Sequence, residues 1–295
     1  MKRKLLIGAY NVDLQGFSEE PFTLKDCNGG RITITAGGVI RNIATTMSYL
    51  REEVSVITAM GEDAFKDILL KDLREAGIED VFILKREMET SSYLNLVDEK
   101  GCFVAGLSDM RCIQSITYEE VIEPIMKADL IVLDGCLHPE LIKKLTLLDK
   151  VIYFDPVSMG KAKVLLESDA CFYGLKLNLL EAKSLLGRDL VEEKDFHELY
   201  EVFSKKGLHE LIVTREEQSV FYRDDKESFF TPVKKIPLVN PSGSGDTFLG
   251  AYLSYKNRGY TSKDAISRAI DAAGLSCQAE EPVSTKLKEQ GGHHG

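Results

Sequence analysis

Short apolar runs, each the length of a buried strand, recur along the chain between stretches whose apolar residues follow helical spacing. The predicted strands cover residues 5–9, 54–59, 130–133, 151–154, 170–175 and 210–213. Strands that alternate with helices pair in parallel and are covered by helices on both faces. The pattern therefore predicts an α/β fold with a doubly wound, mainly parallel sheet flanked by helices. Two later runs, 219–222 and 228–230, predict an antiparallel addition at one edge.

Glycine marks several predicted helix ends. Gly37-Gly38 precedes an apolar stripe at helical spacing, and Gly77 ends the next helix. Two closing helices are predicted, one starting at Asp246 and one running from Thr261 to about residue 279. These helices supply the covering layers that a parallel sheet requires.

Two segments interrupt this alternation. Residues 14–35 and 86–106 contain half-buried strands that alternate polar and apolar side chains, and the turn at 98–101 predicts a hairpin. We expect these strands to form a small β lid on a single domain spanning residues 1–290. The Gly-Gly-His-His-Gly end, residues 291–295, is expected to be an added tail.

Composition narrows the class of partner. The chain has 295 residues, 44% hydrophobic and 28% charged, which suffices for one large core. A formal net charge of −10 argues against a nucleic-acid-binding face and favours a small-molecule ligand. No apolar run approaches the ~20 residues that cross a bilayer. The six cysteines show neither paired nor metal-ligand spacing, so we expect a cytoplasmic protein with reduced thiols.

A glycine-rich turn at Gly243-Ser244-Gly245 opens the first closing helix. The first N–H groups of a helix lack internal partners and its dipole makes that end electropositive, so an anion can bind there. Asp246 follows at once. Its carboxylate has two interpretations: it caps its own helix, or it takes a proton from a nucleophile beside a bound phosphate.

Polar residues follow predicted strands or open predicted helices at four places. These are Asn11 with Asp13, Gly37 and Gly38 with Asn42, Asn178 with Glu181, and Gly243 to Asp246. In a doubly wound sheet such loops converge on one edge, where phosphoryl transfer would find its donors, metal ligands and base. Structural interpretations stay open. Asp13 could start a turn and Asn42 could lie on an exposed helix face. Asn178 and Glu181 have the spacing of a capping box.

Longer motifs carry a family resemblance. Gly-Gly-Val-Ile-Arg-Asn-Ile-Ala at 37–44 and Asn-Pro-Ser-Gly-Ser-Gly-Asp-Thr-Phe at 240–248 resemble the two signatures of the ribokinase-like (PfkB) carbohydrate kinases. Lys-Leu-Asn-Leu-Leu-Glu at 176–181 is similar to the family's Asn-x-x-Glu element. Within the family the chain resembles the pseudouridine kinases. That closer resemblance rests on residues 11–16, 30–42, 90–94, 108–110 and 155–158.

The resemblance implies an ATP-dependent, Mg²⁺-assisted kinase that phosphorylates the 5′-hydroxyl of a nucleoside, with pseudouridine as the acceptor. It makes Asp246 the general base and the amides of Gly243, Ser244 and Gly245 the anion hole. The implied substrate ligands are Asp13, Gly37, Gly38, Asn42, Thr90 and Asp109. The implied nucleotide contacts are Asn178, Thr214 and Lys161, and the implied Mg²⁺ ligand is Glu181. A homodimer joined through the lid strands is also implied.

The sequence departs from the family pattern at several positions. Asn240 stands where these kinases commonly have an Asp that helps to hold a monovalent cation, which leaves a K⁺ requirement open. Ser244 replaces a frequent Ala, and the segment after Thr214 lacks a frequent Gly. Two other functions stay open: a kinase for another nucleoside or a free sugar such as ribose or fructose, and a sugar-binding regulator without catalysis.

Overall fold

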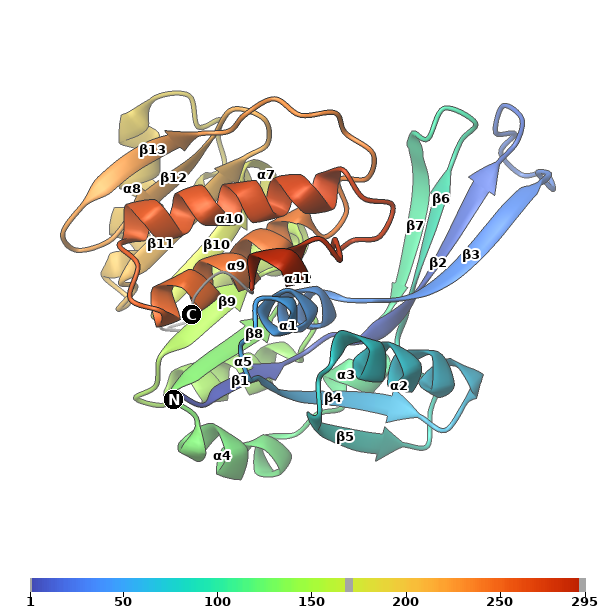
Figure 1. The fold of residues 1–295 in the computed structure, drawn as a ribbon, viewed down its shortest axis with the longest axis horizontal. Coiled ribbons are helices and arrows are strands. Elements are labelled where there is room, and N and C mark those ends of the chain that lie inside the picture. The colour runs from blue at the N-terminus through green and yellow to red at the C-terminus, as the bar shows by residue number, and fades with distance from the viewer. Residues whose placement is uncertain (1, 168–171, 292–295) are drawn as a thin grey trace.

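The computed structural model describes residues 2–167 and 172–291. Within that part of the chain nine strands form one sheet in the order β13-β12-β11-β10-β9-β8-β1-β4-β5 (Figure 1). The strands are β1 (Lys4–Ile7), β4 (Ser55–Gly61), β5 (Asp80–Arg86), β8 (Leu130–Asp134), β9 (Ile152–Asp155), β10 (Gly174–Asn178), β11 (Glu210–Arg215), β12 (Ser219–Arg223) and β13 (Ser228–Pro232).

The pairing within this sheet is parallel from β5 through β11. Among the described strands of this sheet only the far edge is antiparallel, where β12 pairs with β11 and β13 with β12. The doubly wound, mainly parallel sheet and its antiparallel edge are therefore confirmed. β10 begins at Gly174 rather than at residue 170, and residues 170–171 of the predicted strand lie outside the described part.

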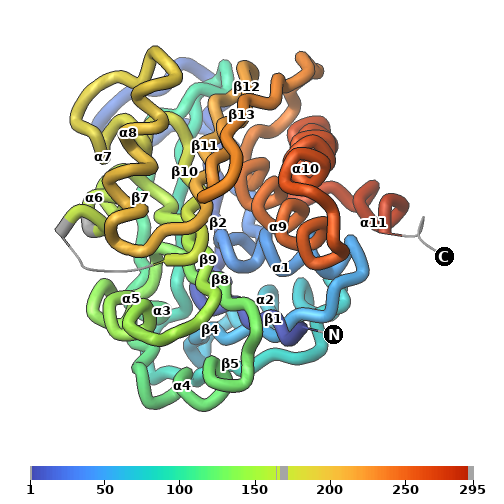
Figure 2. The backbone as a smooth tube through the Cα atoms, turned by 90° about the vertical axis from the view of Figure 1, so that its left-hand side faces the viewer, coloured from blue at the N-terminus to red at the C-terminus, as the bar shows by residue number. Residues whose placement is uncertain are grey.

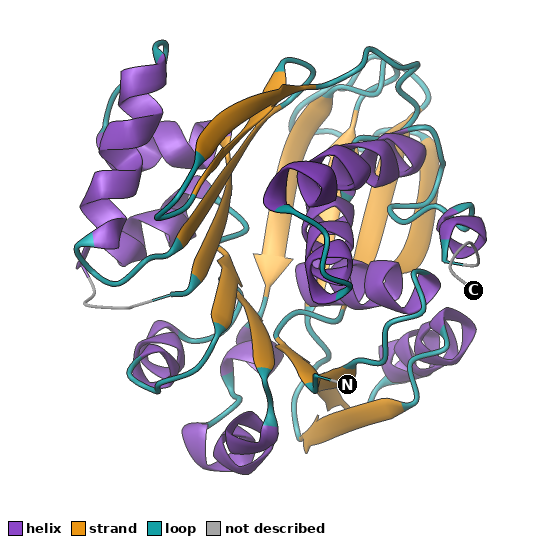
Figure 3. Cartoon of the chain, turned by 60° about the vertical axis from the view of Figure 1, so that its left-hand side comes forward, coloured by secondary structure: helices purple, strands orange, loops and turns teal. Residues whose placement is uncertain are grey.

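Helices cover both faces of the sheet, as Figures 2 and 3 show. They are α1 (Val39–Tyr49), α2 (Ala64–Ala76), α3 (Arg111–Gln114), α4 (Tyr118–Lys127), α5 (Pro139–Thr146), α6 (Met159–Glu167), α7 (Leu179–Leu186), α8 (Glu193–Ser204), α9 (Ser244–Asn257), α10 (Ser262–Cys277) and α11 (Leu287–Gln290). Gly77 ends α2 with φ 70°, the left-handed conformation that glycine adopts without strain, as predicted. None of the helices in the described residues is long and apolar enough to span a membrane.

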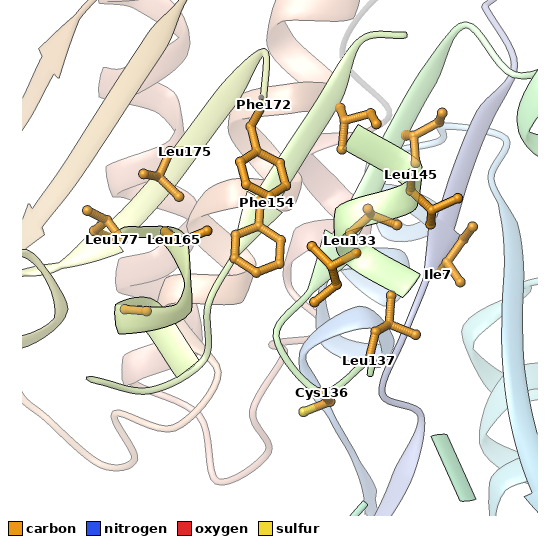
Figure 4. Close-up of a cluster of buried hydrophobic side chains, with 14 of the residues drawn as sticks. Ile7, Leu133, Cys136, Leu137, Leu145, Phe154, Leu165, Phe172, Leu175 and Leu177 are labelled. Atoms are coloured by element: carbon orange, nitrogen blue, oxygen red, sulfur yellow. The ribbon is translucent and has the colours of Figure 1, made fainter. Parts of the chain in front are cut away.

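Alternate residues of each central strand enter different cores. Leu133 and Phe154 pack with Phe172 and Leu145 on the α5–α8 face (Figure 4). Val132 belongs to the other core, which α1, α9 and α10 cover. Because both faces are buried, these strands read as continuous apolar runs rather than alternating ones. The covered sheet fixes the carboxyl ends of its strands, where the polar residues gather.

A second, four-stranded sheet projects from the body as an arm (Figure 1). Its order is β3-β2-β6-β7, with β2 (Asn11–Ser18), β3 (Gly30–Gly37), β6 (Ser92–Val97) and β7 (Phe103–Asp109). This small separate sheet fits the predicted lid, and β6 and β7 form the predicted hairpin. Two details differ from the prediction. The lid begins at Asn11, and residues 80–86 form edge strand β5 of the large sheet.

The arm has two chemically different faces because paired residues point the same way and their neighbours point the opposite way. One row across the strands is Thr35, Asp13, Tyr93 and Ser108. The adjacent row is Ile34, Leu14, Leu94 and Leu107. The sheet thus presents a polar face and an apolar face.

Candidate active site

The amino-terminal ends of α1 and α9 meet, and their polar side chains bond to each other. Asp246 lies in the first turn of α9, and its Oδ2 accepts a hydrogen bond of 2.8 Å from Asn42 Nδ2. Asn42 lies in the first turn of α1. Gly38 permits this start, because its φ is 107° and a Cβ there would lie 2.3 Å from the Ala9 carbonyl oxygen. The bond between Asn42 and Asp246 thus joins residues that are 204 positions apart in the sequence.

The start of α9 also presents free backbone donors. Gly243 precedes the helix with φ 74°, a left-handed conformation suited to glycine. The helix's first internal bond runs from Thr247 N–H to the Gly243 carbonyl at 2.8 Å. The N–H groups of Gly245 and Asp246 come before it, so they are available to an anion.

Asp13 sits at the base of the lid, against α1. Its Oδ1 accepts a hydrogen bond of 2.7 Å from Asn11 Nδ2. A Cβ on Gly37 would lie 2.1 Å from Asp13 Oδ2, so only glycine fits beside this carboxylate. Burial raises the pKa of Asp13 to about 6, against the opposing effects of the Asn11 bond and the Arg41 charge. Asp13 therefore lies beside Gly37, two residues before the first residue of α1, the helix that carries Asn42.

A buried ion pair lies under the glycine turn. Lys176 Nζ lies 2.9 Å from Asp155 Oδ2, and a Cβ on Gly245 would approach that Nζ to 2.6 Å. The carboxylates of Asp155, Asp246 and Glu181 together outweigh the burial that opposes a charged lysine, so they raise the pKa of Lys176. The lysine is therefore a fixed positive charge beside the turn.

The carboxyl group of Asp246 has a strongly raised pKa. Burial, followed by the negative charge of Asp155, raises the pKa of Asp246 to about 7. Lys176 and the Asn42 bond oppose that rise. A carboxyl group with a pKa near the working pH is the form that general-base catalysis favours.

The sequence profile of the pfkB family carbohydrate kinases matches residues 1–289 of this chain. The chain belongs to this family. Pseudouridine kinase of Escherichia coli is 29% identical over 285 residues, covering 93% of this chain and 90% of that protein. Guanosine-inosine kinase of Exiguobacterium acetylicum is 24% identical, covering 97% and 96%. The ribokinase structure of Thermotoga maritima superposes with a TM-score of 0.83 at 18% identity, covering 99% of both chains.

Membership of the pfkB family indicates a phosphotransferase with an alcohol acceptor. In this pfkB-family kinase, Asn178 and Glu181 form the predicted capping box at the start of α7. Glu181 N–H donates to Asn178 Oδ1 at 2.9 Å, and Asn178 N–H donates to Glu181 Oε2 at 2.8 Å. Burial, then the charge of Asp155, raises the pKa of Glu181 to about 7. The sheet register puts Thr214 beside Asn178, and the Thr214 hydroxyl donates to the Leu177 carbonyl at 3.3 Å.

Three other residues with expected ligand roles, Thr90, Asp109 and Lys161, bond to partners away from Asn42 and Asp246. Thr90 is buried, and its N–H and hydroxyl both donate to the carboxylate of Asp63, at 2.7 and 2.8 Å. Asp109 accepts from Arg111 at 2.6 Å. Lys161 Nζ lies 3.1 Å from Cys136 Sγ. Thr90 thus has its donors engaged within the protein, while Asp109 and Lys161 both border a pocket of about 440 Å³.

Sequence reasoning missed the charges below the site. Lys176 and Asp155 belong to the motifs at 176–181 and 155–158 without a role of their own there, and Asp134 lies in none of the motifs. Asp134 accepts from the N–H groups of Ala9 and Cys136, both at 2.8 Å. The available signal was a charged residue at the carboxyl end of an apolar strand, which in this fold faces the ligand edge.

Proposed function

We propose that this pfkB-family kinase transfers the γ-phosphoryl group of ATP to the 5′-hydroxyl of a nucleoside, with pseudouridine as the acceptor. The observation that carries the proposal is the bond between Asn42 and Asp246, which joins the carboxylate at the glycine turn to α1, the helix that follows lid strand β3. In the reaction Asp246 takes the hydroxyl proton while the hydroxyl oxygen attacks the γ-phosphorus. The bond between that phosphorus and the departing ADP oxygen breaks.

The other residues take supporting roles in this proposal. Asp13, Asn42 and the main chain at Gly37 and Gly38 bind the ribose hydroxyls. The amides of Gly243 and Gly245, together with that of Asp246, stabilise the charge that develops on the transferring group. The Ser244 N–H does not take this expected role, because it donates to the Pro241 carbonyl at 3.3 Å. Nucleotide contacts come from Asn178, Thr214 and Lys161. Lys176, close under the turn, adds a fixed charge that needs no reorganisation during the reaction.

Mg²⁺ fits this site as a water-shelled ion rather than as an ion in a protein cage. Among residues 2–167 and 172–291, no group of three or more acidic, His or Cys residues is arranged to hold a metal. Mg²⁺ usually keeps several waters and binds one or two carboxylates plus substrate phosphates. Glu181 would hold the ion in that way, since a nearby cation relieves its buried charge. When bound, the ion neutralises charge on the phosphates of ATP.

The pocket at the end of β7 supports a nucleoside rather than a free sugar. It is lined by Ser108, Asp109, Met110, Arg111, Gln114 and Lys161. Ser108 lies in the same lid row as Asp13, two strands away, which corresponds to ~10 Å. That span suits a base attached to a ribose held at Asp13. Gln114 is exposed at this pocket, where its side-chain amide can pair with a base edge.

The apolar row of the lid supports a homodimer joined through these strands. Ile34 and Leu107, at the two edges of that row, are 47% and 70% exposed, and Ile32 is 72% exposed. A contiguous apolar face of this kind marks an interaction site. Replacing Leu107 with Asp should shift the protein from dimer to monomer in sedimentation equilibrium. A wild-type protein that sediments as a monomer contradicts the dimer.

The deciding experiment measures ATP consumption with pseudouridine, uridine, guanosine, ribose and fructose. We expect pseudouridine to give the highest kcat/KM. Faster phosphorylation of ribose or fructose would contradict the nucleoside assignment. Binding of an acceptor without turnover would support a non-catalytic sugar-binding regulator instead.

A further inference from the structure

Arg41 is linked to the proposed catalytic base through one intervening side chain, Asn42. It follows Ile40 in the first turn of α1 and is 9% exposed. Its Nε donates to Asp72 Oδ2 at 3.0 Å, and its Nη2 bonds to Asp72 Oδ1. The Tyr10 hydroxyl, from the residue just before the lid strand β2, also bonds to Asp72. Asp72 therefore holds the guanidinium through two of its nitrogens, Nε and Nη2.

The remaining arm of the fork reaches Asn42. Arg41 Nη1 donates to Asn42 Oδ1 at 3.1 Å, and Asn42 Nδ2 donates to Asp246 Oδ2 at 2.8 Å. Four side chains from α2, α1 and α9 thus form one chain of hydrogen bonds, from Asp72 to Asp246. Each link in it joins a donor to an acceptor.

The charge of Arg41 decides which way the Asn42 amide points. An amide has an accepting oxygen and a donating nitrogen, whereas a guanidinium can only donate. If the amide turned over, its NH₂ group would face the guanidinium donors and its oxygen would face the Asp246 carboxylate. Both contacts would then be repulsive in a buried site, where unpaired polar groups are costly.

We propose that Arg41 is a positioning residue that locks the Asn42 amide as a hydrogen-bond donor to Asp246, with Asp72 holding the guanidinium in place. The inference rests on the proposed function in giving Asp246 the role of base. Arg41 also lies near Asp13, where its charge favours the ionised carboxylate. The same buried cation therefore acts on two carboxylates: it orients the amide that bonds to Asp246, and its charge favours the ionised form of Asp13.

The test compares Arg41→Met and Arg41→Lys with a matched control, Arg86→Met. Arg86 also forms a partly buried ion pair, with Glu120 at 2.7 Å, but it bonds to Ser115 and not to the site. We expect Arg41→Met to lower kcat ~10- to 100-fold, the effect of losing a hydrogen bond to a charged group. The KM for ATP should change little. Arg41→Lys should recover part of kcat, since an ammonium keeps the charge but not the fork.

A second readout does not depend on turnover. The ¹³C carboxyl signal of Asp246, assigned with Asp246→Asn, reports its titration directly. Its pKa should rise by about 1 in Arg41→Met, because the carboxylate loses the Asn42 amide as a fixed hydrogen-bond donor. It should be unchanged in Arg86→Met.

The outcomes separate the two proposals. Wild-type kcat and an unchanged Asp246 titration in Arg41→Met would overturn the positioning role. Equal losses of kcat in Arg41→Met and Arg86→Met, each matching the loss of folded protein, would also overturn it. If the wild type phosphorylates none of the acceptors, the proposed function fails, and the carboxyl titration alone decides the role of Arg41.

Discussion

Helix α9 carries buried polar side chains that serve two different purposes. Further along the helix, the Tyr252 hydroxyl donates to Glu210 Oε2 at 2.7 Å, and Tyr153 donates to the same oxygen at 2.7 Å. At its start, Asp246 accepts from Asn42 but lies beside the carboxylate of Asp155. The carboxylate of Glu210 is satisfied by two neutral donors, whereas that of Asp246 is held near a like charge.

This difference teaches how to recognise a reactive group among buried ones. Burial alone is shared by Glu210 and Asp246. What distinguishes Asp246 is the unfavourable neighbour together with a surface of free backbone donors at the helix start. The Glu210 cluster is therefore expected to determine stability, and Asp246 to determine turnover.

The largest expected effect is that of Asp246→Asn on turnover. Loss of a general base typically costs ~10²- to 10⁴-fold, so kcat should fall by that amount. The amide can still accept from Asn42, and acceptor binding measured by calorimetry should persist. Asp264→Asn is the matched control, because Asp264 also lies in the first turn of its helix, α10, but is exposed. An Asp246→Asn variant with near-normal kcat would contradict the role of base.

The pH dependence should show the same contrast. Because Asp246 must be ionised to act, kcat/KM should fall as the pH drops below about 7, approaching tenfold for each further pH unit. The stability effect has the opposite direction. The pKa of Asp246 in the folded protein is raised above its ordinary value of 3.8. The stability that this group contributes to the folded state is therefore fully present below pH 3.8 and is lost as the pH rises through about 7. Asp246→Asn should therefore raise Tm at pH 8 and change it little at pH 4. A larger gain at pH 4 would refute this linkage.

Glu210→Leu should have the opposite effect to Asp246→Asn: a loss of stability with little loss of turnover. The Tyr153 and Tyr252 hydroxyls would lose their buried acceptor, which should lower the free energy of unfolding by ~2–4 kcal/mol. Urea denaturation measures this loss. At a temperature well below the new midpoint, kcat should stay close to that of the wild type. A selective loss of kcat without loss of stability would show that the two ends of α9 are not separable in function.

The smallest effect concerns the monovalent cation that the family resemblance left open. Asn240 Nδ2 donates to the Glu280 carbonyl at 2.8 Å, and its Oδ1 accepts from Ser242 N–H at 2.9 Å. The side-chain amide thus joins the glycine turn to the segment after α10 through both of its ends. Replacing K⁺ by tetramethylammonium should change kcat/KM by less than about twofold, since the amide's donor and acceptor are already satisfied. Asn240→Asp should make turnover more dependent on K⁺, and a strong dependence in the wild type would contradict the expectation.

Much of the fold could be predicted because it follows from local pattern. The apolar runs of β1, β4, β8, β9 and β11 indicated a buried parallel sheet, and Gly77 indicated the end of α2. Edge strand β5 was missed because its half-exposed residues carry a weaker apolar signal. The lid hairpin was predicted from its turn, but the start of the lid at Asn11 was not, since a chain leaving one sheet for another shows no local break.

The sequence by itself determined which polar residues stand at strand ends and helix starts, because those positions depend on neighbours a few residues away. Only the tertiary structure decided which of them meet. The Asn42–Asp246 bond, the Lys176–Asp155 pair and the Arg41–Asp72 fork each join distant segments. Such contacts, and the burial that raises the pKa of Asp246, depend on how the layers pack, which no short stretch of sequence specifies.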